Sequence, residues 1–96
     1  MEQSYKGILS LDPIDGYHMS DYDFECVLYV RANRKLVIHK SQLIKYDDDN
    51  YILTLDTSDL SRIGYGRINL DVIGHIPDDD FRKGYRKEVL KLWIDM

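Results

Sequence analysis

Residues 21–30, DYDFECVLYV, alternate between apolar and polar side chains more clearly than any other stretch of the chain. Apolar residues occupy every second position from Tyr22 to Val30, and Asp23 and Glu25 lie between them. Successive side chains of a strand point to opposite faces, so this pattern predicts a strand with one buried and one wet face, as in an antiparallel sheet. Val27 and Tyr29 add apolar surface to the outer face, which suggests that this face is partly covered too.

Outward from this stretch, turn-forming residues separate further short apolar segments of period two, at intervals of roughly 8–15 residues. Residues 47–50 are predicted to be the polar tip of a hairpin, and residues 56–63 a crossing segment with one helical turn capped by Asp56 or Thr57. Gly74, inside a strand pattern, indicates a bulge or a close backbone approach. The further predicted strands cover residues 5–11, 36–39, 41–46, 51–55 and 67–76.

The segment Tyr85–Ile94 is ambiguous between helix and strand. Its Arg, Lys, Glu and Leu residues favour a helix by propensity. As a strand, it places Tyr85, Val89 and Trp93 on one face and Leu90, Leu92 and Ile94 on the other. We predict a strand, because the six or seven preceding strands form a sandwich that needs a final one. The prediction is one all-β domain over residues 1–96, an immunoglobulin-like antiparallel β-sandwich of about seven strands. The Cys…Trp…Cys core of antibody domains is absent, so the likeness is architectural.

The core is expected to come from the two best alternating stripes. Cys26, the single cysteine, excludes an intramolecular disulfide and is predicted to be a buried, inert thiol. The residues expected to be largely buried are Phe24, Cys26, Leu28, Ile68, Leu70 and Val72.

The charge of the chain argues against nucleic acid as its main partner. Thirteen basic and 17 acidic residues give a formal charge of −4, whereas phosphate binding needs a basic face. No signal-peptide pattern and no apolar run of about 20 residues occurs, so we expect synthesis in the cytoplasm and no membrane partner. Local basic clusters are interpreted as solvated strand ends and loops; they are Arg31, Arg34, Lys35 and Lys40, and then Arg82, Lys83, Arg86, Lys87 and Lys91.

The sequence offers little for catalysis or metal binding. The acidic runs 47–50 and 78–80 could supply oxygen ligands to calcium, but neither has the EF-hand form, and we interpret both as solvated turns. His18, His39 and His75 form no pair at zinc-ligand spacing. No phosphate loop or nucleophile elbow is present. We expect no enzymatic activity, no cofactor, no metal and no small-molecule substrate.

Several phrases resemble short phage and prophage proteins of gut Bacteroidetes and the amino-terminal sandwich domain of phage baseplate and fibre proteins. They span roughly residues 20 to 90, and the most telling is the proline–acid loop joined to a Gly-x-Arg-x-Glu stretch. The phrases are Tyr22-Asp23-Phe24-Glu25, Leu55-Asp56-Thr57-Ser58-Asp59-Leu60, Gly64-Tyr65-Gly66, and Ile76-Pro77-Asp78-Asp79-Asp80-Phe81 followed by Gly84-x-Arg86-x-Glu88.

The resemblance implies a structural module of the phage particle, present in many copies or as a homo-oligomer, made in the host cytoplasm and then built into the virion. Its partners would be other virion proteins. Fibre and baseplate proteins continue into a longer distal region, whereas this chain stops at Met96, so we expect an accessory, connecting or capsid-decorating role. The alternative is a carbohydrate-binding module, for which Tyr17, Tyr65 and Trp93 could supply aromatic rings.

The candidate interface is the loop Pro77–Gly84 and the strand after it. Phe81 is an apolar ring in an otherwise charged loop, and binding residues concentrate in loops. The competing interpretation is that Phe81 folds back and caps the end of the sandwich. The residues predicted to form the interface are Phe81, Arg82, Tyr85 and Arg86.

Overall fold

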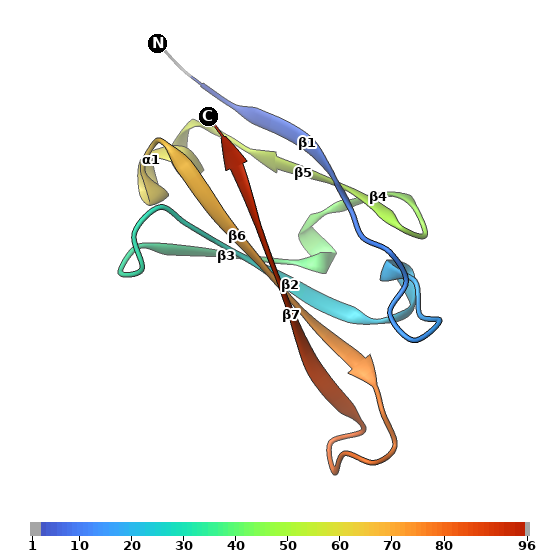
Figure 1. Ribbon diagram of the computed structural model, residues 1–96. Helices are drawn as coiled ribbons and strands as arrows, with labels where there is room; N and C mark the ends of the chain where they lie inside the picture. Colours follow the sequence, from blue (N-terminus) through green and yellow to red (C-terminus); the bar gives the residue numbers. More distant parts are fainter. Residues whose placement is uncertain (1–2, 96) are drawn as a thin grey trace.

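The computed structural model describes residues 3–95 and is built from two antiparallel sheets (Figure 1). One sheet has three strands in the order β1-β5-β4, and the other has four in the order β3-β2-β6-β7. The elements are β1 (Tyr5–Ser10), η1 (Met19–Asp21), β2 (Asp23–Tyr29), β3 (Lys35–His39), η2 (Lys40–Gln42), β4 (Ile44–Asp47), β5 (Asn50–Leu55), α1 (Thr57–Ile63), β6 (Arg67–Pro77) and β7 (Tyr85–Asp95).

The predicted all-β sandwich of seven strands is confirmed. The ambiguous carboxyl-terminal segment is strand β7, which pairs with β6 from Arg67↔Asp95 to Pro77↔Tyr85. The helical turn expected in residues 56–63 is α1, and Asp56 caps it by accepting a hydrogen bond from the Asp59 amide at 2.9 Å. The predicted hairpin around residues 47–50 is the β4–β5 pair.

Two strand boundaries were predicted wrongly. The expected strand 21–30 begins only at Asp23, because Met19–Asp21 form a 3₁₀ turn that the Asp21 carboxylate closes by accepting from the His18 amide. The expected strand 41–46 likewise begins late, after the 3₁₀ turn η2, and runs from Ile44 to Asp47. In each turn a side chain three residues on binds a backbone amide, and this local bond competes with strand pairing.

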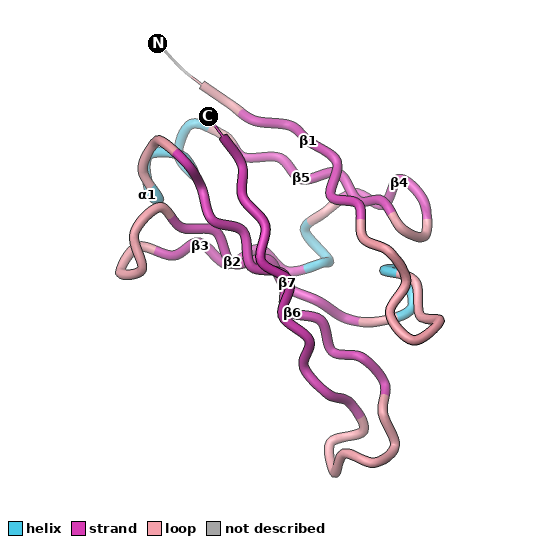
Figure 2. The backbone as a smooth tube through the Cα atoms, in the orientation of Figure 1, coloured by secondary structure: helices cyan, strands magenta, loops and turns pink. Residues whose placement is uncertain are grey.

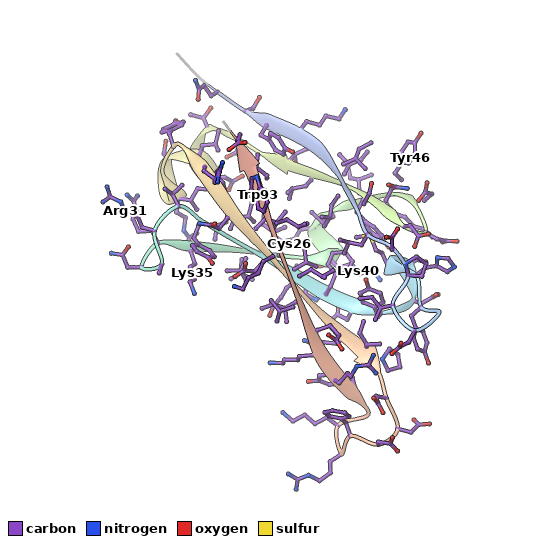
Figure 3. The ribbon with its side chains drawn as sticks, in the orientation of Figure 1. Cys26, Arg31, Lys35, Lys40, Tyr46 and Trp93 are labelled. Atoms are coloured by element: carbon purple, nitrogen blue, oxygen red, sulfur yellow. The ribbon has the colours of Figure 1, made fainter. Side chains whose placement is uncertain are left out.

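The core lies between the sheets and contains all six residues predicted for it. Phe24 makes an edge-on contact with Tyr51 of the opposite sheet, with ring centroids 5.5 Å apart. Cys26 lies near the centre of the molecule (Figure 3), and its burial raises the pKa of the thiol to about 12, so it stays protonated. Gly74 causes no break in register; a Cβ there would lie 3.2 Å from the Tyr22 ring, so the glycine permits a close approach.

The longest hairpin of the molecule is formed by β6 and β7. The last pair that joins β6 to β2 is Asp23↔His75, so the end of the hairpin continues without β2 beside it. Residues 78–84 therefore project beyond the sheets (Figure 2), and the molecule measures 49 × 29 × 19 Å along its principal axes. We call residues 76–86, the end of this hairpin with its loop, the arm.

Candidate protein-binding surfaces

The arm ends in a loop that its own backbone holds in shape. The Asp78 amide donates to the Gly84 carbonyl at 2.9 Å, and the Gly84 amide donates to the Phe81 carbonyl at 2.8 Å. Gly84 has a φ of 83°, a left-handed conformation that glycine adopts without steric cost. The loop is thus an ordered turn that presents the side chains at its tip in a defined way.

Phe81 lies at the tip of the arm and is 50% exposed, so it does not fold back to cap the sandwich. It lines a shallow hollow of about 370 Å³ together with Arg82, Lys83 and Tyr85. Tyr85 is half-buried because its ring stacks on His75, with centroids 4.6 Å apart. Three of the four predicted interface residues, Phe81, Arg82 and Tyr85, therefore meet at one place.

Arg86, the fourth predicted residue, has a different position. Its Nε donates to Glu88 at 2.8 Å, its Nη1 donates to Asp78 at 2.9 Å, and its Nη2 pairs with Asp15. The hydrogen bonds that Arg86 donates to Glu88, Asp15 and Asp78 raise the pKa of the guanidinium, which stays charged. The expectation that this arginine is solvated is wrong: it ties both strands of the arm to the loop after β1.

The outer face of the four-stranded sheet is a second open surface. Register aligns Lys35, Tyr29, Asn69 and Trp93 in one row across all four strands. The Lys35 ammonium lies 5.2 Å from the Tyr29 ring, and the Arg67 guanidinium lies 5.7 Å from the Trp93 ring. Trp93 is exposed at the edge of this face (Figure 3). Of the three rings proposed for sugar binding, Trp93 lies in the same row as Tyr29, with Asn69 between them, Tyr17 packs against the core, and Tyr65 is exposed in a separate loop.

The acidic turn 47–50 is hydrogen-bonded to its neighbours rather than simply solvated. The Asp47 carboxylate accepts from the Asp49 amide at 2.9 Å, and these backbone bonds hold its pKa below the ordinary value. Asp48 pairs with Lys45 at 3.1 Å, and Asp49 contacts His18 Nδ1 at 2.8 Å. Among residues 3–95, no group of three or more His, Cys, Asp or Glu side chains is placed to hold a metal ion.

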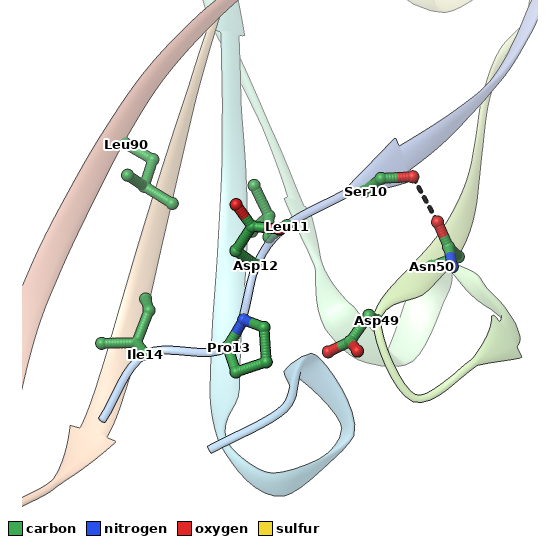
Figure 4. Close-up of a pocket in the computed structure, with 8 residues that line it drawn as sticks. All are labelled: Ser10, Leu11, Asp12, Pro13, Ile14, Asp49, Asn50 and Leu90. Carbon is green, nitrogen blue, oxygen red and sulfur yellow. Dashed lines mark hydrogen bonds between the residues drawn. The ribbon is translucent and has the colours of Figure 1, made fainter. Parts of the chain in front are cut away.

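Sequence reasoning missed the flank where β1 and β7 face each other. A hollow of about 540 Å³ lies there (Figure 4), lined by the end of β1, the loop after it, the Asp49–Asn50 turn and Leu90. A second hollow of about 250 Å³ lies between β1 and the Leu92–Ile94 part of β7. The sequence signal for this flank is the alternation of Leu90, Leu92 and Ile94 on one face of the predicted last strand.

Comparison with protein families, with curated proteins and with solved structures finds no match to this chain. In the part of the chain that the structure describes, no helix is long and apolar enough to cross a membrane.

Proposed function

We propose that this protein is a structural component of a phage particle, and that it acts by binding other virion proteins rather than by catalysis. The observation that carries the proposal is the arm. It projects beyond the sheets, its loop is held by backbone hydrogen bonds, and it presents a half-exposed phenylalanine among charged residues. Protein-binding surfaces commonly have aromatic residues and arginine at their centre and a polar, solvent-accessible rim.

The phage setting of the proposal rests on the resemblance of the loop 77–84 and the Gly-x-Arg-x-Glu stretch to virion proteins. In this proposal the protein is made in the host cytoplasm and enters the particle in many copies. The arm inserts Phe81 into a pocket of a neighbouring virion protein, and Arg86 keeps the arm in a fixed direction. A pre-organised arm loses little conformational entropy on binding.

Incorporation into particles tests the proposal. Phe81→Ala should leave the melting temperature unchanged and reduce incorporation by about tenfold or more, the loss expected for a central apolar anchor. Tyr65→Ala is a matched control, because Tyr65 is 53% exposed but lies in a different loop. Equal incorporation of the two variants would remove the arm from the interface. Absence of the wild-type protein from purified particles would refute the virion role.

The row Tyr29–Asn69–Trp93 favours carbohydrate binding as a second candidate function. The Tyr29 and Trp93 rings are separated by two strand spacings, about 10 Å. Asn69 lies between them in the row, and Asp71 lies beside it on β6. Sugar rings could stack on such a platform while Asn69 and Asp71 bind hydroxyl groups. Trp93 is the single tryptophan, so its fluorescence would report an oligosaccharide directly. Trp93→Ala and Tyr29→Ala should each abolish binding measured by calorimetry, and Tyr46→Ala, a comparably exposed tyrosine on β4, should not.

A further inference from the structure

The two sheets do not cover each other equally. The inner residues of β6, Ile68, Leu70 and Val72, are buried. Their register partners on β7 are Ile94, Leu92 and Leu90. The exposed fraction of these side chains rises toward the start of β7, from 9% at Ile94 to 36% at Leu90. The three-stranded sheet thus covers β6 and ends short of β7. The inner face of β7 lacks the strand that would lie opposite it.

Because the three-stranded sheet does not cover β7, a groove runs along one flank of the sandwich. The two hollows described above share Ser10 and contact successive inner-face residues of β7, Leu90 and Leu92. They therefore adjoin one another between β1 and β7. Figure 4 shows Leu90 and Ile14 on one side of the larger hollow, with Asp49 and Asn50 on the other. The smaller hollow is lined mostly by aliphatic side chains, whereas the larger one is lined by aliphatic residues and by Ser10, Asp12, Asp49 and Asn50.

Both strands that border the groove are edge strands. Among residues 3–95, β1 pairs only with β5, and β7 pairs only with β6. An edge strand presents backbone amides and carbonyls that can pair with an added strand. A strand added to β1 would extend the three-stranded sheet to four, and its alternate side chains would point toward Leu90 and Leu92.

The charge at one end of the groove indicates which segment fits. Asp12 is exposed at the end of the groove that follows β1. Asp49 lines the same end, but its carboxylate is already paired with His18 at 2.8 Å. A basic side chain on the occupant would lie beside Asp12. If the added strand runs antiparallel to β1, that basic residue belongs at its amino-terminal end.

We propose that the groove between β1 and β7 binds an extended segment of a partner protein by strand addition. The segment carries aliphatic side chains at alternate positions and a lysine or arginine at its amino-terminal end, and it supplies the missing fourth strand of the smaller sheet. This surface is distinct from the arm, and its occupation does not depend on the phage role proposed above.

The probe is a synthetic peptide of the length of β1, with lysine first and then alternating valine and serine. A control peptide of the same composition has its valines adjacent, so that it cannot place them all on one face. Calorimetry should show binding of the alternating peptide at concentrations up to about 1 mM and at least about tenfold weaker binding of the control. Equal binding of the two peptides, or binding of neither, would overturn the proposal.

Matched variants of one strand then locate the peptide. Leu90→Asp places a charge in the groove and should weaken binding by about tenfold or more. Val89→Asp changes the next residue, which is 51% exposed on the opposite face, and should leave the affinity within about twofold. Both variants are first checked by circular dichroism, and the peptide comparison on the wild-type protein needs no variant. A stronger effect of Val89→Asp would overturn the proposal. So would a concentration-dependent dimer that the peptide disrupts, because the groove would then be filled by a second copy of this chain.

Discussion

At the scale of single residues, the structure changes the role of a lysine that the sequence placed in solvent. Lys40 Nζ donates to the Met19 carbonyl at 2.9 Å and to the Tyr22 carbonyl at 2.7 Å. The same ammonium lies 5.6 Å from the Phe24 ring and 5.7 Å from the Tyr51 ring. Partial burial lowers its pKa, and its stem crosses apolar surface. Lys40 therefore joins η1 and the start of β2 to the segment that follows β3.

Tyr22 has a buried polar atom without a hydrogen-bond partner. Its ring is buried, and its hydroxyl makes no hydrogen bond among the described residues. An unsatisfied buried hydroxyl costs about 1–3 kcal/mol of desolvation. Tyr22→Phe should therefore leave the free energy of unfolding unchanged or raise it by about 1 kcal/mol. Chemical denaturation measures this, and a loss of more than about 1 kcal/mol would show that the hydroxyl has a partner, such as a bound water.

His18 makes the stability of the protein depend on pH. Its ring contacts both carboxylate oxygens of Asp49, at 2.8 and 3.0 Å, and this hydrogen bond and the charge of Asp49 raise the pKa of His18. A histidine whose pKa is higher in the folded state stabilises that state fully below its unfolded pKa of about 6.5. The contribution falls as the pH rises through the raised value.

The difference in melting temperature between wild type and His18→Gln should therefore be largest near pH 5–6 and shrink toward pH 9, on either side of the histidine's titration. Asp49→Asn should remove the same pH-dependent part, since it removes the partner charge. Differences that stay constant over this range would show that the pair contributes no proton-linked stability.

At the scale of elements, the arm depends on one arginine that reaches three carboxylates. Asp78 lies in the arm, Glu88 lies in β7 two residues beyond it, and Asp15 lies in the loop after β1. The hairpin alone fixes the register of β6 and β7. Its direction relative to the sandwich is also set by this bond to Asp15. The sequence predicts Arg86 as part of the interface because it lies in the strand after the loop Pro77–Gly84, whereas its contacts with three carboxylates are those of a positioning residue.

Arg86→Gln should loosen the arm without unfolding the sandwich. It leaves three carboxylates near one another without their shared cation, so the amides of residues 78–84 should exchange with deuterium roughly tenfold faster. Exchange at Cys26 and Leu70, in the centre of the larger sheet, should not change. Arg82→Gln is the control, because Arg82 is exposed in the same loop. An equal effect of the two variants would mean that the arm depends on overall charge and not on this contact.

At the scale of the whole molecule, two sheets of unequal width explain where the open surfaces lie. A three-stranded sheet cannot cover a four-stranded one, so an aliphatic strip of β7 is left beside the free edge of β1. The arm results from a second inequality, that of strand length, since β6 and β7 have 11 residues each and β2 has seven. Both features lie at the ends or edges of the larger sheet, where pairing stops.

The sequence by itself determined an all-β chain of about seven strands and the buried face of residues 21–30 and 67–76. It left Tyr85–Ile94 ambiguous between helix and strand. Alternation along residues 21–30 and 67–76 is a local property, because the side chains of a strand point to opposite faces whatever the strand packs against. The same reasoning found Phe81 as an apolar residue in a charged loop. Strand ends were less predictable, since the 3₁₀ turns at Met19–Asp21 and Lys40–Gln42 compete locally with pairing.

Only the tertiary structure decided which edges face each other and which charges leave the solvent. The groove between β1 and β7 joins residues about 80 positions apart, and the Arg86–Asp15 bond spans 71 positions. Such pairs leave no periodic signal in the sequence, because they depend on how two complete sheets pack. For the same reason Lys40 and Arg86 look like solvated cations in the sequence, although each is held in place by the folded chain.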